Sequence, residues 1–99
     1  MYVRMLWGRL RQGGWDEYER YYNEHIEAVT QGVRGFLGRQ LLQSTENPDE
    51  GMSVTLWDSL EALRAYATSP RRQEAARGID HLYVGEYWVR NFEIRSSTI

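Results

Sequence analysis

The segment from Gly35 to Leu63 constrains the fold of this 99-residue chain more than any other part of the sequence. It begins with Gly-Phe-Leu-Gly, passes through the polar, turn-rich stretch 45–51, and continues with Val-Thr-Leu-Trp-Asp-Ser. Two apolar runs separated by turn-forming residues indicate a hairpin, and an Asp-Ser pair before a new apolar period indicates a helix start. The segment therefore predicts strand, turn, strand and helix, with Trp57 at the last junction.

The remaining sequence supplies two further strands and two further helical stretches. Apolar residues at steps of three and four build one helix face that includes Tyr18, Tyr22 and His25. A second helix follows the Asp-Ser pair, and Ser69 with Pro70 marks a fresh helix start. We expect strands over residues 2–10, 36–44, 52–57 and 84–94, and helices over residues 15–31 and 71–77. The helix between them is capped by Asp58 or Ser59 and carries Leu63 and Tyr66 on its apolar side.

The order β-α-β-β-α-β predicts an α+β fold of the ferredoxin-like type, with an antiparallel sheet and helices on one face. The last strand is apolar on both faces, which requires a cover on the second face as well. A twin subunit is the simplest cover, because two-fold dimers are the commonest oligomers. We therefore expect a single domain over residues 1–95, a frayed tail over 96–99, and a homodimer through the open sheet face that forms a dimeric α+β barrel.

Composition excludes several classes of function. A net charge of −2 argues against a nucleic-acid partner. Cysteine and lysine are absent, so neither a thiolate nor a Schiff-base lysine is available, and any anion-stabilising side chain must be Arg. No apolar run is long enough to cross a membrane, and no secretory signal pattern is visible, so a cytoplasmic protein without membrane contact is the default expectation.

Two histidines and one tryptophan are candidates for chemistry, each with a structural alternative. His25 could act as a general base, or it could be a helix-edge residue with one hydrogen bond. His81 could line the mouth of a pocket, or it could be a loop residue without a role. Trp57 could form a pocket wall with a free N–H, or it could be a core anchor. The two histidines lack a recognised metal-ligand spacing, so no metal site is expected.

Tyrosines and one arginine complete the candidate set. Tyr22, Tyr66, Tyr83 and Tyr87 could hydrogen-bond a planar phenolic ligand while packing against it, or they could belong to an aromatic core and a dimer seam. Arg77, near the end of a predicted helix, could reach the pocket and stabilise an anion.

The Gly-Phe-x-Gly strand start and the Trp-Asp-Ser junction resemble motifs of the antibiotic biosynthesis monooxygenase family over about residues 3–93. The resemblance implies small dimeric α+β barrels and a cofactor-independent oxygenase acting on a quinol, an anthrone or a polyketide-like aromatic. In that scheme His25 is the base, and Trp57, Tyr66 and Arg77 hold the substrate anion while it passes an electron to O2, without flavin or metal. No Asn lies near Trp57, which departs from the family's pocket set.

The haem-degrading branch of the same superfamily implies an Asn on the first strand, an aromatic residue after the Trp junction and a His ten residues later. Tyr66 fills the aromatic position, but Ala76 stands at the position of the His, and the first Asn is Asn23. The sequence therefore argues against haem degradation. Two other functions stay open for this fold: a non-catalytic dimer that binds a small ligand or stabilises a partner, and an isomerase or lyase that uses the same base without oxygen.

Overall fold

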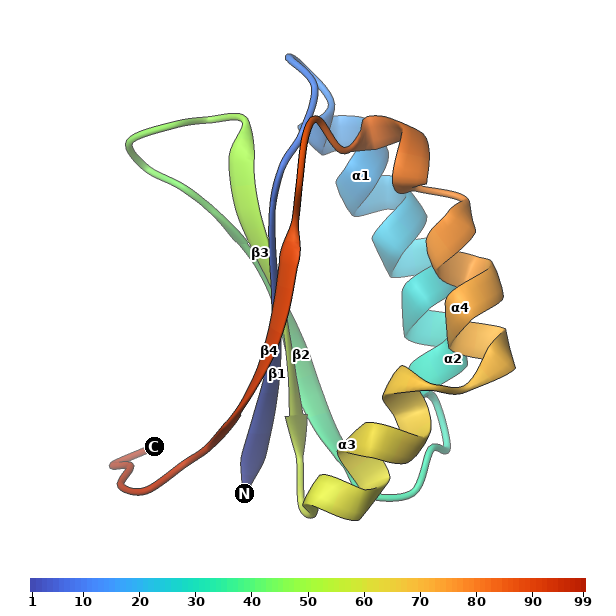
Figure 1. The fold of residues 1–99 in the computed structure, drawn as a ribbon, viewed down its shortest axis with the longest axis vertical. Coiled ribbons are helices and arrows are strands. Elements are labelled where there is room, and N and C mark those ends of the chain that lie inside the picture. Colours follow the sequence, from blue (N-terminus) through green and yellow to red (C-terminus); the bar gives the residue numbers. More distant parts are fainter.

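The computed structural model describes residues 1–99 as one antiparallel sheet with a layer of helices on one side (Figure 1). The strands are β1 (Tyr2–Arg9), β2 (Phe36–Gln43), β3 (Glu50–Trp57) and β4 (Trp88–Glu93), in the spatial order β2-β3-β1-β4. The helices are α1 (Trp15–Tyr21), the π-helical η1 (Tyr22–Ile26), α2 (Glu27–Thr30), α3 (Leu60–Ala67), α4 (Pro70–Arg77) and the 3₁₀-helical η2 (Asp80–Leu82). This arrangement confirms the predicted ferredoxin-like fold.

α1, η1 and α2 form one helix whose buried residues fall at steps of four: Tyr18, Tyr22, Ile26 and Thr30. In a regular α-helix a step of four turns about 40° past a full circle, so such a stripe would drift away from the sheet. The π turn, in which the Glu27 N–H donates to the Tyr22 carbonyl, corrects that drift.

The π turn also corrects one sequence prediction. The helical period places both His25 and Ile26 on the apolar face with Tyr18 and Tyr22, but the structure buries only Ile26 of these two and turns His25 to solvent. A regular helical period cannot distinguish these two neighbouring positions, because the local widening decides which one faces the sheet.

Two serine caps fix where α3 and α4 begin. The Ser59 Oγ accepts a hydrogen bond from the Ala62 N–H at 3.1 Å, and the Ser69 Oγ accepts one from the Arg72 N–H at 3.2 Å. Pro70 occupies the first turn of α4, where its missing N–H costs nothing. The predicted helix starts are therefore confirmed.

The last strand is shorter than predicted. β4 begins at Trp88, whereas alternation indicated a strand from residue 84. Gly85 has a φ of +72°, a left-handed conformation that interrupts extended backbone. The preceding segment continues the sheet only through the bridge between Leu10 and Tyr83 and a hydrogen bond from the Val84 N–H to the Arg9 carbonyl at 2.8 Å. The residues between that bridge and β4 therefore form a loop at the end of the helix layer.

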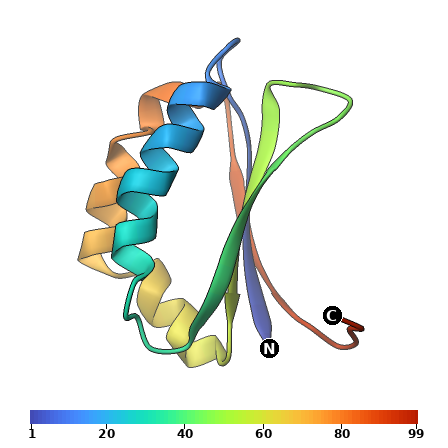
Figure 2. The ribbon, with the colours of Figure 1, turned by 180° about the vertical axis from the view of Figure 1, so that it is seen from behind.

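The core lies between the helices and the sheet (Figure 2). One cluster joins the long helix, formed by α1, η1 and α2, to the segment after α4. A second cluster joins the end of β3 to α3. The clusters consist of Leu10, Tyr18, Tyr22, Ile26, Ile79 and Leu82, and of Trp57, Leu63 and Tyr66.

The opposite sheet face has no helix over it in either view (Figures 1 and 2). Strand register places Val3 beside Phe92 and Trp7 beside Trp88 on this face, and the two tryptophan rings are stacked with centroids 6.2 Å apart. Phe92 and Leu42 remain largely exposed. None of the helices has the length and apolar character that crossing a membrane would require.

Candidate active site

A small, partly open cavity of about 60 Å³ lies between the helix layer and the sheet. Side chains from β1, β3, α1, η1, α3, α4, η2 and the loop before β4 converge on it. They are Arg4, Leu6, Tyr18, Tyr22, Ile26, Ser53, Tyr66, Arg72, Ala76, Ile79, Asp80, Tyr83 and Tyr87.

Tyrosine hydroxyls dominate the polar lining of the cavity. The hydroxyls of Tyr18 and Tyr83 are hydrogen-bonded at 2.9 Å, and the Tyr22 hydroxyl is hydrogen-bonded to the Ser53 hydroxyl. Burial raises the pKa of Tyr83 to about 12, and it also raises the pKa of Tyr18, Tyr22 and Tyr66. These hydroxyls are therefore protonated at neutral pH, so they can donate hydrogen bonds to an anion but cannot act as bases.

Arg4 extends from the central strand β1 and is only 7% exposed. It takes part in none of the four ion pairs of the protein and in no side-chain hydrogen bond, and its Nε is buried without an acceptor. Burial, and then the neighbouring Arg72 guanidinium, lower the pKa of Arg4. The cavity therefore contains a positive charge that the protein itself does not neutralise.

Arg72 adds a second guanidinium from α4, and it is partly buried. Its charge lowers the pKa of Tyr18, Tyr22, Tyr66 and Tyr83, against the larger effect of burial. Asp80 is the only carboxylate in the lining, is exposed, and forms no ion pair. The charge balance of the cavity is therefore positive inside, with a carboxylate at its rim.

Trp57 supports the cavity from outside. It is fully buried, its indole N–H donates to the Thr55 Oγ1 at 2.9 Å, and its ring packs against Phe36 and Tyr66 with centroids 5.3 and 4.8 Å away. It is absent from the cavity lining. Of the two interpretations of Trp57, the core anchor fits this geometry, and its effect on the site is to hold the Tyr66 ring.

Three predicted site residues lie away from the cavity. The His25 side chain is 54% exposed, lies against the Tyr21 ring at 4.3 Å and approaches Glu24. The His81 Nε2 is 2.8 Å from the Glu17 Oε2 on the surface. Arg77 is exposed at the end of α4, because the inward face of that helix carries Arg72 and, one turn later, Ala76.

Tyr22, Tyr66, Tyr83 and Tyr87 are the candidate residues from the sequence that do line the cavity. Sequence reasoning missed Arg4 and Arg72, together with Tyr18, Ser53 and Asp80. Arg4 carried a visible signal, because alternation places it between Tyr2 and Leu6 on one face of the first strand, where a charge on a buried face is uncommon.

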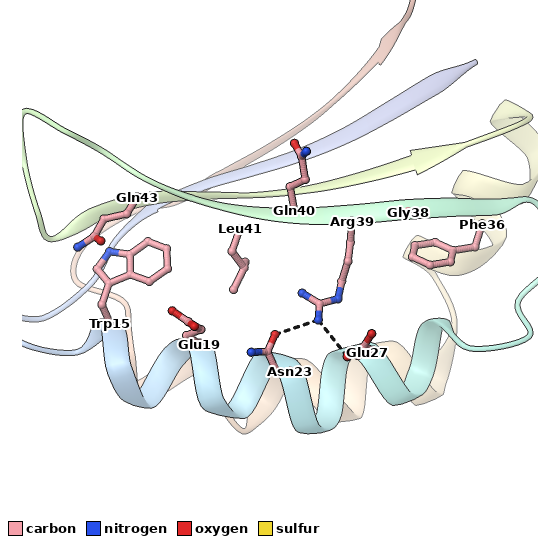
Figure 3. A pocket seen from close by; sticks show the side chains of 10 residues that line it. All are labelled: Trp15, Glu19, Asn23, Glu27, Phe36, Gly38, Arg39, Gln40, Leu41 and Gln43. Atoms are coloured by element: carbon pink, nitrogen blue, oxygen red, sulfur yellow. Dashed lines mark hydrogen bonds and ion pairs between the residues drawn. The ribbon is translucent and has the colours of Figure 1, made fainter. Parts of the chain in front are cut away.

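A larger hollow of about 620 Å³ runs between the long helix and edge strand β2 (Figure 3). Arg39 crosses it from β2 and donates to the Asn23 Oδ1 at 2.9 Å and to the Glu27 Oε2 at 3.1 Å, while Trp15 and Phe36 lie at its two ends. Its central positive charge is therefore already paired, unlike that of Arg4. No three His, Cys, Asp or Glu side chains anywhere in the protein are grouped as metal ligands.

A family model described as antibiotic biosynthesis monooxygenase matches residues 1–78, about four-fifths of the chain. The chain belongs to the antibiotic biosynthesis monooxygenase family. No curated protein sequence matches it significantly.

Three solved structures place this antibiotic biosynthesis monooxygenase family member among known folds. SnoaB, a cofactor-independent oxygenase from Streptomyces nogalater, is 16% identical, with a TM-score of 0.79 over 98% of this chain and 96% of SnoaB. A Deinococcus radiodurans protein assigned to the same family is 17% identical, with a TM-score of 0.81 over 100% and 97%. MhuD, a haem degrader from Mycobacterium tuberculosis, is 26% identical, with a TM-score of 0.77 over 99% of each chain.

The lining of this family member's cavity lacks most of the usual protein ligands of haem iron. No His, Cys or Met lines it, and these are three of the side chains that usually hold haem iron. Tyrosine is the remaining protein ligand of that kind. The hydroxyls of Tyr18, Tyr22 and Tyr83 are engaged with one another or with Ser53, whereas Tyr66 and Tyr87 line the cavity as well.

Proposed function

We propose that this chain is a cofactor-independent monooxygenase that acts on a small aromatic substrate such as a quinol, an anthrone or a related polyketide-like compound. One observation carries the proposal: tyrosine hydroxyls and two guanidinium groups without carboxylate partners converge on one small cavity between the helices and the sheet. Membership of the family and the likeness to a cofactor-independent oxygenase support the same conclusion.

The arrangement favours the deprotonated form of a phenolic or enolisable substrate. A guanidinium in a low-dielectric site lowers the free energy of an adjacent anion far more than it would in water. Arg4 and Arg72 supply that charge from the sheet and from α4. The tyrosine hydroxyls are held protonated and can donate to the same anion.

The substrate proton needs an acceptor other than these tyrosines. Asp80, the lining carboxylate, is at the rim and exposed, so it can take the proton and pass it to solvent. His25 is outside the cavity and is not given this role.

The reaction then involves the substrate and O2 alone. The substrate carbanion transfers one electron to O2, and the resulting radical pair combines to a peroxide. Loss of water from that peroxide leaves a carbonyl, so a CH2 group and O2 become C=O and H2O, which balances atoms and electrons. The protein contributes by binding the anion, excluding water and holding the proton acceptor.

We also propose that two copies pair through the open sheet face. The face is continuous across the four strands, carries Trp7, Trp88 and Phe92, and has no cover of its own. Large exposed apolar surfaces of this kind usually mark an interface. Light scattering of purified Phe92→Glu and of the wild type tests this, because only the wild type should have the mass of a dimer.

Oxygen consumption by the purified protein without added cofactor tests the enzymatic proposal. The panel contains hydroquinones, anthrones and catechols, and the variants are Arg72→Gln and Arg71→Gln. These two arginines are neighbours on α4, but only Arg72 lines the cavity. We expect Arg72→Gln to lower kcat/KM by about 10²-fold and Arg71→Gln to leave it unchanged.

Two results would contradict the proposal: no uptake above autoxidation with any compound of the panel, or equal rates in the two variants. Turnover of a panel compound that needs no oxygen would instead indicate an isomerase or lyase.

A further inference from the structure

We propose that, among the aromatic substrates proposed above, the cavity selects those that already carry an anionic group at neutral pH. The group that it recognises has two oxygen atoms side by side, as in an aromatic carboxylate, and is bound by Arg4. This inference names the substrate class of the same cavity and therefore rests on the function proposed above. Its evidence, however, is the charge and geometry of Arg4 and not the reaction with oxygen.

The first step is the missing counter-charge. Arginine side chains that are nearly fully buried are rare unless they are paired, because an unpaired charge in a protein interior is strongly unfavourable. Arg4 is 7% exposed and has no carboxylate partner, while the ion pairs of the protein all involve other, mostly exposed residues. Asp80, the only lining carboxylate, makes no ion pair with it. An external anion would complete this site.

The second step is the direction from which Arg4 can be reached. Its Nε is enclosed by protein and has no acceptor, whereas its two Nη groups are neither enclosed in that way nor hydrogen-bonded. A ligand therefore meets the guanidinium through the two Nη groups. This end of the fork matches a carboxylate, or another group with two oxygens side by side, in a bidentate arrangement.

The third step concerns the side chains around the Arg4 guanidinium. Arg72 contributes a second positive charge, which disfavours cationic ligands. The rings of Tyr18 and Tyr22 lie 5.9 Å apart and form an aromatic wall, which suits an aromatic body behind the anionic group. The class is therefore a small aromatic acid.

Such a ligand requires the cavity to widen, because about 60 Å³ is less than the roughly 150 Å³ in which an engineered cavity holds benzene. Tyr87 is the lining side chain that can move most easily. It is 52% exposed, makes no hydrogen bond, and lies against Tyr83 with ring centroids 5.3 Å apart. Gly85, with its positive φ, lies two residues before it.

Calorimetric titration and thermal shift with salicylate test the inference on the full chain. Salicylamide is the matched neutral probe, because it keeps the ring and the hydroxyl but lacks the carboxylate. We expect salicylate to bind and to raise Tm, and salicylamide to bind at least about tenfold more weakly. We expect Arg4→Met to lose at least about tenfold in salicylate affinity, and Arg9→Met, an exposed arginine of the same strand, to keep it.

Equal affinity for the two probes, or salicylate binding that Arg4→Met leaves intact, would overturn the inference. If Arg4→Met does not fold, the pair Arg72→Gln and Arg71→Gln replaces it, and only Arg72→Gln should lose salicylate affinity. Loss in both variants, or in neither, would overturn the inference. The titration involves no oxygen. Arg4-dependent salicylate binding without oxygen uptake on the panel removes only the oxygenase proposal, and uptake without such binding removes only this inference.

Discussion

Replacing Arg4 with Met should make the protein more stable, although it removes a group that we assign to the site. The Arg4 guanidinium is almost fully buried, lacks a carboxylate partner and has an Nε without an acceptor. Met has a similar length and no polar atom to desolvate, so it can retain most of the packing of the aliphatic stem.

The size of the effect follows from these contacts. Leaving one buried donor unsatisfied costs about 1–3 kcal/mol, and exchanging buried ionic groups for apolar residues of similar volume has gained about 1–4 kcal/mol. The nearby positive charge of Arg72 adds repulsion in the same direction. We expect Arg4→Met to raise the free energy of unfolding by about 1–3 kcal/mol, and each kcal/mol corresponds to about 4–8 °C in Tm for a domain of this size.

Urea denaturation and calorimetry at one fixed protein concentration measure this effect, because dimerisation would otherwise shift Tm. Arg9→Met is the control and should stay within about 0.5 kcal/mol of wild type, as exposed substitutions usually do. A Tm of Arg4→Met at or below that of the wild type would refute the reasoning. Salicylate at about 100 times its wild-type Kd should then stabilise the wild type by about 2.7 kcal/mol, and a loss of at least tenfold in affinity limits its effect on Arg4→Met to about 1.4 kcal/mol or less.

Three further predictions concern the walls of the cavity. Gly8→Ala should destabilise the fold by about 1–3 kcal/mol in urea denaturation, because its Cβ would stand 2.6 Å from the Tyr83 ring, and an unchanged midpoint would contradict this. Trp57→Phe should cost about 1–3 kcal/mol by leaving the buried Thr55 hydroxyl without its donor, whereas Thr55→Val in the same background should recover part of the loss. Burial raises the pKa of Tyr83 to about 12, so the folded protein keeps the Tyr83 hydroxyl proton at pH values where the unfolded chain has lost it. The free energy of unfolding should therefore be constant below about pH 10 and fall between about pH 10 and 12. Tyr83→Phe should flatten that fall.

The elements that depend on local sequence could be predicted. The hairpin, the two serine-capped helices and the order of strands follow from turn residues, caps and alternation, which act within a few residues of the chain. The π turn of η1 could not be predicted from local sequence, because its effect is to keep the buried stripe of the helix against the sheet, which is a tertiary contact. The start of β4 could not be predicted from alternation either, since glycine adopts extended and left-handed backbone about equally readily and Gly85 is left-handed here.

The candidate site was predicted in part. Tyr22, Tyr66 and Tyr83 line the cavity, as an aromatic face on several elements suggested. The two histidines were chosen for their chemistry, and chemistry does not reveal which side of a helix or loop they occupy. Arg4 was missed because its significance is an absence of partners, which only the assembled structure shows.

The π turn of η1 also affects how this sequence should be aligned with those of its relatives. A π turn holds one more residue than the α turn that it replaces. A relative with a regular helix would then match this chain correctly up to Tyr22 and be displaced by one position beyond it, unless a gap is opened within Tyr22–Ile26. Without that gap, the solvent-facing His25 would be paired with the cavity-lining residue of the relative, and Ile26 with its exposed neighbour.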